Sequence, residues 1–265
     1  MSFKNQIIKS NYHTHMYLCR HASGTVEDYV KEAIKLGFKE IGMSDHAPWI
    51  ELIDRSVRME KEDYPIYLKE LEEAIKKYSD KIKIYKGLEI EYFSNADDYY
   101  KKLLNDMDYL TLGQHYIEKD GKLISIYRIS SLEDLTIYKD TLIKAMSTGF
   151  FKFISHPDIF LYSTEQLTPE ILKLAEEIII AAKEKNIPLE FNANGIRKGK
   201  IMVNGEERYR YPRLEFWKLV KKHHARCILS SDAHKPEYLF DEAILEAHKF
   251  LQDIHLEVEE VLDFN

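Results

Sequence analysis

Histidine and carboxylate side chains recur in short motifs, each of which follows a run of apolar residues. The first motif, His13-Thr14-His15, places two imidazoles two residues apart, so both rings point to the same side of an extended segment. Imidazole nitrogens and carboxylate oxygens are ligands that Zn, Fe and Mn share. The motifs therefore predict a metal centre, and its predicted ligands are His13, His15, His21, His46, Glu89, His115, His156, Asp232 and His234.

The size of this set indicates more than one ion. Seven histidines and two acids exceed the needs of a single four-coordinate ion, so we expect two or three divalent ions. Glu89, with two carboxylate oxygens, is suited to bridge two of them. Two ions several ångströms apart could activate a water and neutralise an anionic leaving group. The histidines within or beyond predicted helices are interpreted as structural; these are His223, His224, His248 and His255.

Apolar runs and helical patterns alternate along the chain, as in an α/β protein. The predicted strands lie over 7–12, 39–43, 82–88, 109–112, 151–154, 188–191 and 226–229. The predicted helical segments lie over 26–36, 61–78, 97–104, 131–146, 168–185, 213–222 and 236–251. This alternation indicates a parallel sheet that closes into a barrel, with a doubly wound open sheet as the alternative. In a barrel the C-terminal ends of the strands meet at one mouth, where six of the seven would deliver a predicted ligand.

Composition and charge narrow the classes of partner. The chain has 265 residues and a net charge of −7, without a basic block that would track a nucleic-acid backbone. Cys19 and Cys227 give no disulfide framework, and the longest apolar run, 178–182, is too short to cross a bilayer. We expect a single domain over 1–265 that is cytoplasmic and acts on a small molecule, with no nucleic-acid or membrane partner. The oligomeric state stays open.

Taken in order, the motifs resemble the polymerase and histidinol phosphatase (PHP) superfamily. The matching segments are His13-Thr14-His15 with His21, Ser44-Asp45-His46, Gly87-Leu88-Glu89, His115, Ser155-His156-Pro157 and Ser231-Asp232-Ala233-His234. They span residues 13–234, nearly the whole chain. The resemblance implies a distorted (β/α)7 barrel, which is TIM-like, and a trinuclear centre of Zn, Mn or Fe.

The resemblance also implies how the ligands are shared among three ions. One ion would be held by His13, His15, Glu89 and Asp232. Glu89 would bridge to a second ion, held by His115 and His156. The third would be held by His21, His46 and His234.

Within the superfamily, the chain most resembles the monofunctional histidinol-phosphate phosphatases of histidine biosynthesis. The shared features are Ser-Asp-His-Ala-Pro at 44–48, an insert with Arg58-Met59, Gly-Leu-Glu-Ile-Glu-Tyr at 87–92, and Leu-Glu-Phe-Asn at 189–192 leading to Gly-Ile-Arg-Lys at 195–198. The resemblance implies hydrolysis of L-histidinol phosphate to L-histidinol and phosphate. Gly113-Gln114-His115-Tyr116 departs from the Gly-Ser-Val-His form of many of these phosphatases. Phosphotyrosine, another small phosphometabolite or a phosphodiester therefore stays open as the substrate.

Hydrolysis of a phosphate monoester needs an activated water in line with the leaving oxygen and cations around the equatorial oxygens. We hypothesise that a metal-bridging hydroxide attacks phosphorus and that Asp45 or Asp232 carries the proton. Arg197, in the loop after the strand at 188–191, could offer a planar fork to the phosphate, and Arg58 is a second candidate. The alternative for Arg197 is a surface position in a basic loop.

Histidinol phosphate carries an amine and an imidazole, so an acid and an aromatic ring near the mouth would favour its binding. Glu190 and Glu91 are the candidate acids, and Tyr116 is a candidate ring. Each could instead be a barrel-interior or solvated residue.

Two other classes compete with this interpretation. A metal-dependent amidohydrolase shares the first His-x-His motif, but it typically has eight strands and a bridging lysine where this chain has His115. A non-enzymatic metal-binding module would close its coordination shells, whereas a catalytic site keeps water positions that exchange.

Overall fold

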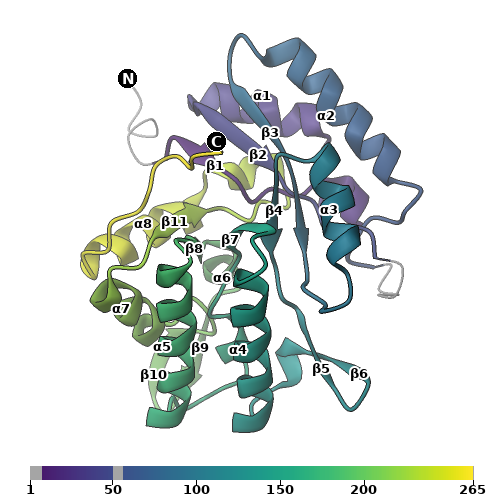
Figure 1. Ribbon diagram of the computed structural model, residues 1–265. Helices are drawn as coiled ribbons and strands as arrows, with labels where there is room; N and C mark the ends of the chain where they lie inside the picture. Colours follow the sequence, from purple (N-terminus) through teal and green to yellow (C-terminus); the bar gives the residue numbers. More distant parts are fainter. Residues whose placement is uncertain (1–7, 50–55, 265) are drawn as a thin grey trace.

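Seven parallel strands form one sheet that curls into a nearly closed barrel (Figure 1). The computed structural model describes residues 8–49 and 56–264. Barrel strands are neighbours in chain order, β1-β2-β3-β4-β7-β8-β11. The two edge strands meet at their C-terminal ends, where Thr14 and Ala233 form a parallel bridge and the N–H of His15 donates to the Ala233 carbonyl at 2.9 Å. The predicted seven-stranded barrel is confirmed.

The elements follow one another in the predicted alternation. The barrel strands are β1 (Ser10–Asn11), β2 (Glu40–Met43), β3 (Lys83–Ile90), β4 (Tyr109–Leu112), β7 (Phe151–Ile154), β8 (Leu189–Asn192) and β11 (Cys227–Ser230). The α-helices are α1 (Val26–Leu36), α2 (Tyr64–Tyr78), α3 (Asp97–Asp106), α4 (Leu132–Met146), α5 (Pro169–Glu184), α6 (Asn194–Arg197), α7 (Leu214–His223) and α8 (Glu242–Asp253). Short 3-10 helices are η2 (Tyr17–Cys19), η3 (Ile126–Arg128), η4 (Ile159–Leu161) and η5 (Pro236–Leu239). No helix among the described residues is long and apolar enough to cross a membrane.

Local capping sequences set the ends of the helices. The Thr25 hydroxyl accepts from the N–H of Asp28 in a capping box that starts α1, and Gly37 ends it with a left-handed φ of 79°. One expected helix is wrong in its bounds: 236–251 divides into η5 and α8. Asp241 causes the division, because its side chain accepts from the N–H of Ile244 and starts a new helix there.

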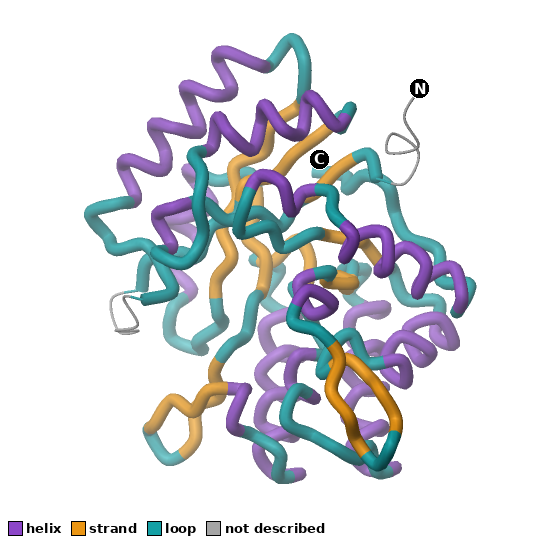
Figure 2. The backbone as a smooth tube through the Cα atoms, turned by 180° about the vertical axis from the view of Figure 1, so that it is seen from behind, coloured by secondary structure: helices purple, strands orange, loops and turns teal. Residues whose placement is uncertain are grey.

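Two β-hairpins, which the strand pattern did not predict, lie in loops that follow barrel strands. Tyr116–Lys119 (β5) pairs with Lys122–Ser125 (β6) after β4, and Lys200–Val203 (β9) pairs with Glu206–Tyr209 (β10) after β8. Figure 2 shows both hairpins standing out from the same end of the barrel. Their turns are Asp120-Gly121 and Asn204-Gly205, whose four φ angles are all positive, as type I′ turns require. These dipeptides were the signal in the sequence that could have located the hairpins.

The barrel interior changes from aromatic to polar along its axis. Tyr12, Tyr85, Tyr109 and Phe153 belong to a separate buried cluster near the N-terminal ends of the strands. Side chains alternate along a strand, so the residues two and four positions after Tyr85 on β3 also face the barrel interior. These residues are Gly87 and Glu89, and they lie above the aromatic cluster. The aromatic layer therefore forms the floor on which the polar residues of the mouth stand.

Gly87 is required by this floor, because a Cβ at this position would lie 2.2 Å from the ring of Tyr109. We expect Gly87→Ala to lower the free energy of unfolding by about 1–3 kcal/mol, the usual cost of overpacking a core. Urea unfolding measures the change. In a Tyr109→Val background the same substitution should cost much less, because the ring is gone. Equal costs in the two backgrounds would contradict the packing argument.

Candidate metal centre

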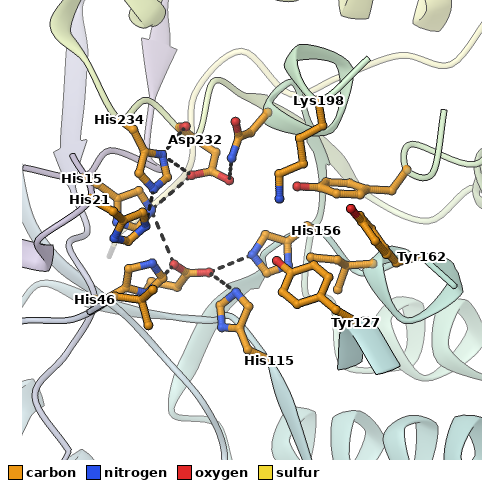
Figure 3. Close-up of a pocket in the computed structure, with 15 residues that line it drawn as sticks. His15, His21, His46, His115, Tyr127, His156, Tyr162, Lys198, Asp232 and His234 are labelled. Carbon is orange, nitrogen blue, oxygen red and sulfur yellow. Dashed lines mark hydrogen bonds and ion pairs between the residues drawn. The ribbon is translucent and has the colours of Figure 1, made fainter. Parts of the chain in front are cut away.

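The nine predicted metal ligands gather at the C-terminal mouth of the barrel. Eight of them line one pocket of about 540 Å³ (Figure 3); these are His15, His21, His46, Glu89, His115, His156, Asp232 and His234. The ninth, His13, is fully buried, and its Nε2 lies 3.3 Å from Glu89 and 3.7 Å from Asp232. Residues more than 200 positions apart in the chain are thus brought together by the strand order.

Glu89 lies at the centre of the cluster and is almost fully buried. Its Oε1 lies 2.8 Å from Nε2 of His156 and 3.7 Å from Nε2 of His115. Its Oε2 lies 3.0 Å from Nδ1 of His46 and 3.3 Å from Nε2 of His13. The two oxygens face different sets of imidazoles, an arrangement that fits the bridging role predicted for this carboxylate.

His13 and His15 turn their Nε2 atoms toward each other at 3.0 Å. Nδ1 of His13 lies 2.8 Å from the Glu190 carboxylate. Nδ1 of His15 lies 3.3 Å from the Asp45 carboxylate. In the neutral rings Nδ1 therefore carries the proton, and both Nε2 atoms present lone pairs beside Asp232. Acceptor atoms that converge in this way repel one another unless a cation or added protons lie among them, so the donor set fits a metal site.

Several overlapping groups of ligand atoms could each hold an ion. Their ligand atoms lie within 4.8 Å of one another in five groups: His15, His46 and His234; His13, His15 and Asp232; His13, Glu89 and His156; His46, Glu89 and His115; and His15, Cys19 and Asp45. The cluster therefore suits a multi-metal site. His46 belongs to two of these groups. It could share an ion with His15 and His234, or one with Glu89 and His115.

The charges of the cluster shift the protonation of its members. Burial lowers the pKa of His13, but the carboxylates of Glu190, Asp232 and Glu89 outweigh burial and raise that pKa well above its usual value. Burial likewise raises the pKa of Glu89, but the surrounding histidines hold it well below its usual value. Near the surface of the pocket, burial and the charge of His15 lower the pKa of His234 to about 3. The carboxylates are thus held ionised, as metal ligands must be.

The predicted substrate-binding acids lie behind the cluster rather than in the pocket. Glu190 binds Nδ1 of His13 and also accepts from the N–H of His156 at 2.9 Å. Glu91 accepts from Nδ1 of His115 at 3.1 Å and pairs through both oxygens with Arg58, at 2.9 and 3.1 Å. Carboxylates in such positions fix the tautomer and orientation of ligating histidines. Glu190, Glu91 and Arg58 are committed to these pairs and do not line the pocket.

The other predicted residues are divided between pocket and scaffold. Asp232 lines the pocket, whereas Asp45 is enclosed and holds His15. Arg197 turns away from the pocket: its guanidinium forms a bidentate pair with Asp241, at 2.7 and 3.1 Å, and donates to the Tyr238 carbonyl. Tyr116 lies on β5 and does not line the pocket.

The pocket contains residues that the sequence interpretation did not single out. Lys198 directly follows Arg197 on the α6 turn, yet it extends into the pocket, opposite the histidines (Figure 3). Tyr127, Tyr162 and Tyr211 line the same wall. Adjacent basic residues on one turn cannot be told apart by periodicity, and three of 18 tyrosines carry no distinguishing pattern.

Backbone conformation and close packing adapt the strand ends to this cluster. His156 and Asp232 both have left-handed φ angles, 33° and 48°, which non-glycine residues rarely adopt. Gly113 follows β4 where a Cβ would lie 2.0 Å from Oε1 of Glu89. The Glu89 carboxylate therefore occupies space that only glycine leaves free.

Comparisons with known proteins identify the family of this chain. The PHP domain family matches residues 11–194. A "probable histidinol-phosphatase" of Deinococcus radiodurans is 26% identical over 84% of this chain and 85% of its own length. The histidinol-phosphatase of Bacillus subtilis is 24% identical over 86% of this chain and 94% of its own. A histidinol phosphate phosphatase of Lactococcus lactis, solved with Zn, L-histidinol and phosphate, shares the fold at a TM-score of 0.68 and 17% identity, covering 94% of this chain and 95% of that one.

The contact between Glu190 and His13 generates a prediction about metal affinity. In Glu190→Gln, the amide group must place its NH₂ against either the His13 Nδ1–H or the His156 N–H, so one of the two contacts that hold these ligands is lost. We expect metal affinity to fall roughly 10- to 100-fold, the usual effect of losing such an outer carboxylate. Competition with a chelator, followed by elemental analysis, measures it. Glu176→Gln, which alters a surface Glu–His pair with His223, is the matched control. Equal affinities in the two variants would contradict an orienting role for Glu190.

Proposed function

Because this chain belongs to the PHP domain family and is a phosphoric monoester hydrolase, we propose that its substrate is L-histidinol phosphate, which it hydrolyses to L-histidinol and phosphate. The relatives named histidinol-phosphatase support this substrate, and a pocket of about 540 Å³ suits a small ester. We assign two or three divalent ions to the cluster, with Zn, Mn and Fe as the candidates, and the nine predicted ligands as their holders.

One juxtaposition carries the proposal: the predicted metal cluster shares its pocket with a cation that has no acidic partner within residues 8–49 and 56–264. Among the described residues Lys198 forms no ion pair, and its Nζ lies 5.3 Å from the ring centroids of Tyr127 and Tyr211. Partial desolvation in the pocket lowers the pKa of Lys198, while Asp232 and Glu89 oppose this shift. An ionised phosphate monoester would complement both the cluster and this ammonium.

The residues of the pocket can divide the work of hydrolysis. Divalent ions held by the cluster would neutralise phosphoryl charge and lower the pKa of a water. Lys198 would donate to a phosphoryl oxygen from the opposite wall, in place of the predicted Arg197. Of the two predicted proton carriers, Asp45 is enclosed and Asp232 lines the pocket, where it is also a predicted metal ligand. Asn192 and Asn194 each donate to its Oδ2 at 3.1 Å, which leaves Oδ1 directed at the cluster.

Metal dependence tests the activity itself. We expect steady-state hydrolysis of L-histidinol phosphate to be lost after exhaustive chelation and restored by adding Zn, Mn or Fe. Phosphate release measures turnover, with phosphotyrosine as the second substrate because the tyrosines of the pocket wall would also accept a phenyl ring. Full activity without metal would contradict the mechanism. If phosphotyrosine is hydrolysed and L-histidinol phosphate is not, the proposed substrate is wrong and phosphotyrosine takes its place.

Lys198→Ala tests the phosphate-binding cation. A hydrogen bond to a charged group contributes about 1.5–3 kcal/mol, so we expect kcat/KM to fall roughly 10- to 100-fold. Lys200→Ala, an exposed lysine two residues away, is the control and should match the wild type. Arg197→Ala should instead lower thermal stability, because it removes the pair with Asp241 at the start of α8. A fall in kcat/KM in Arg197→Ala but not in Lys198→Ala would mean that Arg197, and not Lys198, binds the phosphate.

A further inference from the structure

Three tyrosines form the wall of the pocket that faces the histidine cluster. Tyr127 lies in η3 after the β5–β6 hairpin, Tyr162 directly follows η4, and Tyr211 lies in the loop after β10. Figure 3 shows Tyr127 and Tyr162 across the cavity from His15 and His21. Three separate loops therefore bring aromatic rings to one place.

The rings are arranged to receive another flat group. Tyr127 and Tyr162 lie edge to face, with centroids 4.9 Å apart and planes at 81°. Tyr162 and Tyr211 lie 6.3 Å apart, and Tyr211 also meets the His156 ring edge to face at 6.4 Å. Within the described part of the chain, no hydrogen bond occupies the hydroxyls of these three tyrosines. The wall thus offers ring faces and phenol groups to a ligand.

Acidic side chains are scarce in the pocket. Its described lining contains two carboxylates, Glu89 and Asp232, and both belong to the cluster. Glu190 and Glu91, the acids expected to bind an amine, are committed to His13 and to Arg58 with His115. The positive group that the wall itself presents is Lys198. Among the residues that the structure describes, this wall therefore offers no acid to an ammonium on the substrate.

From this combination we propose that Tyr127, Tyr162 and Tyr211 are specificity-determining residues that select monoesters with a flat ring in the leaving group. The ring is recognised by stacking and by phenol hydroxyls, and a substrate amine contributes little. This inference rests on the proposed phosphomonoesterase activity, and it deepens it by naming the part of the substrate that is recognised. Lys198 keeps the phosphoryl group between the wall and the cluster, so the ring of a short ester reaches the tyrosines.

Two analogues of histidinol phosphate separate the ring from the amine. The ester 3-(imidazol-4-yl)propyl phosphate keeps the ring and lacks the amine, whereas alaninol phosphate keeps the amine and lacks the ring. We expect the first to retain kcat/KM within about threefold of histidinol phosphate and the second to lose tenfold or more, the usual effect of one aromatic stacking contact. The opposite order would overturn the inference, because it would mean that an acid recognises the amine.

Tyrosine variants locate the effect on the wall. With 3-(imidazol-4-yl)propyl phosphate and propyl phosphate as a pair, the wild type should prefer the ring about tenfold. Tyr162→Leu should bring that ratio close to one, whereas Tyr162→Phe, which keeps the ring, should preserve most of it. A ratio unchanged in Tyr162→Leu, with a native melting curve, would overturn the assignment. If phosphotyrosine is hydrolysed and loses activity in Tyr162→Leu, while neither imidazole ester is a substrate, the proposed substrate fails and the selection of a ring by this wall stands. If no monoester is hydrolysed, both fail together.

Discussion

The mouth of the barrel is organised by acceptor atoms that cannot lie so close together without positive charge among them. Nε2 of His13 and Nε2 of His15 are 3.0 Å apart, with the oxygens of Glu89 and Asp232 beside them. Such a set is repulsive in the absence of cations, and in a buried site the repulsion is weakly screened. Divalent ions held by these groups would convert the repulsion into coordination. The remainder of the site can be understood as the means by which the fold holds these groups in place.

Outer groups supply much of that holding. Glu190, Asp45 and Glu91 each face the Nδ1 of one cluster histidine, which leaves Nε2 as the inward atom. Glu91 is in turn fixed by Arg58, so a buried ion pair restrains an imidazole rather than a substrate. The aromatic floor beneath gives these polar groups a rigid base. A metal centre of this kind therefore depends on residues that touch neither ion nor ester.

The sequence predicts the features that follow from periodicity and falls short on those that depend on side-chain direction. The bounds of α1, β4 and β7 agree with the predicted ranges because apolar spacing and capping residues define them locally. The nine predicted ligands meet because they follow barrel strands, which converge whatever their separation in the chain. Arg197 and Lys198 are adjacent on one turn. The ion pair with Asp241 directs Arg197 away from the pocket, whereas Lys198 extends into it. Glu190 and Glu91 were expected to face the substrate at the mouth. Strand alternation predicts the face on which a side chain lies, but it does not predict which partner the side chain contacts there.

In the proposed function, chemistry and selectivity arise in different parts of the fold. The cluster is built from the ends of strands and from backbone in unusual conformations, such as that of His156 and Asp232, which tolerate little change. The tyrosine wall comes instead from loops, two of them attached to the β5–β6 and β9–β10 hairpins. Loops accept substitution and insertion more readily than strands do. Substitutions in this wall would therefore change the ester that is selected while leaving the cluster intact. The departure at Gly113-Gln114-His115-Tyr116 lies where β4 passes into the first hairpin, beside the segment that carries Tyr127.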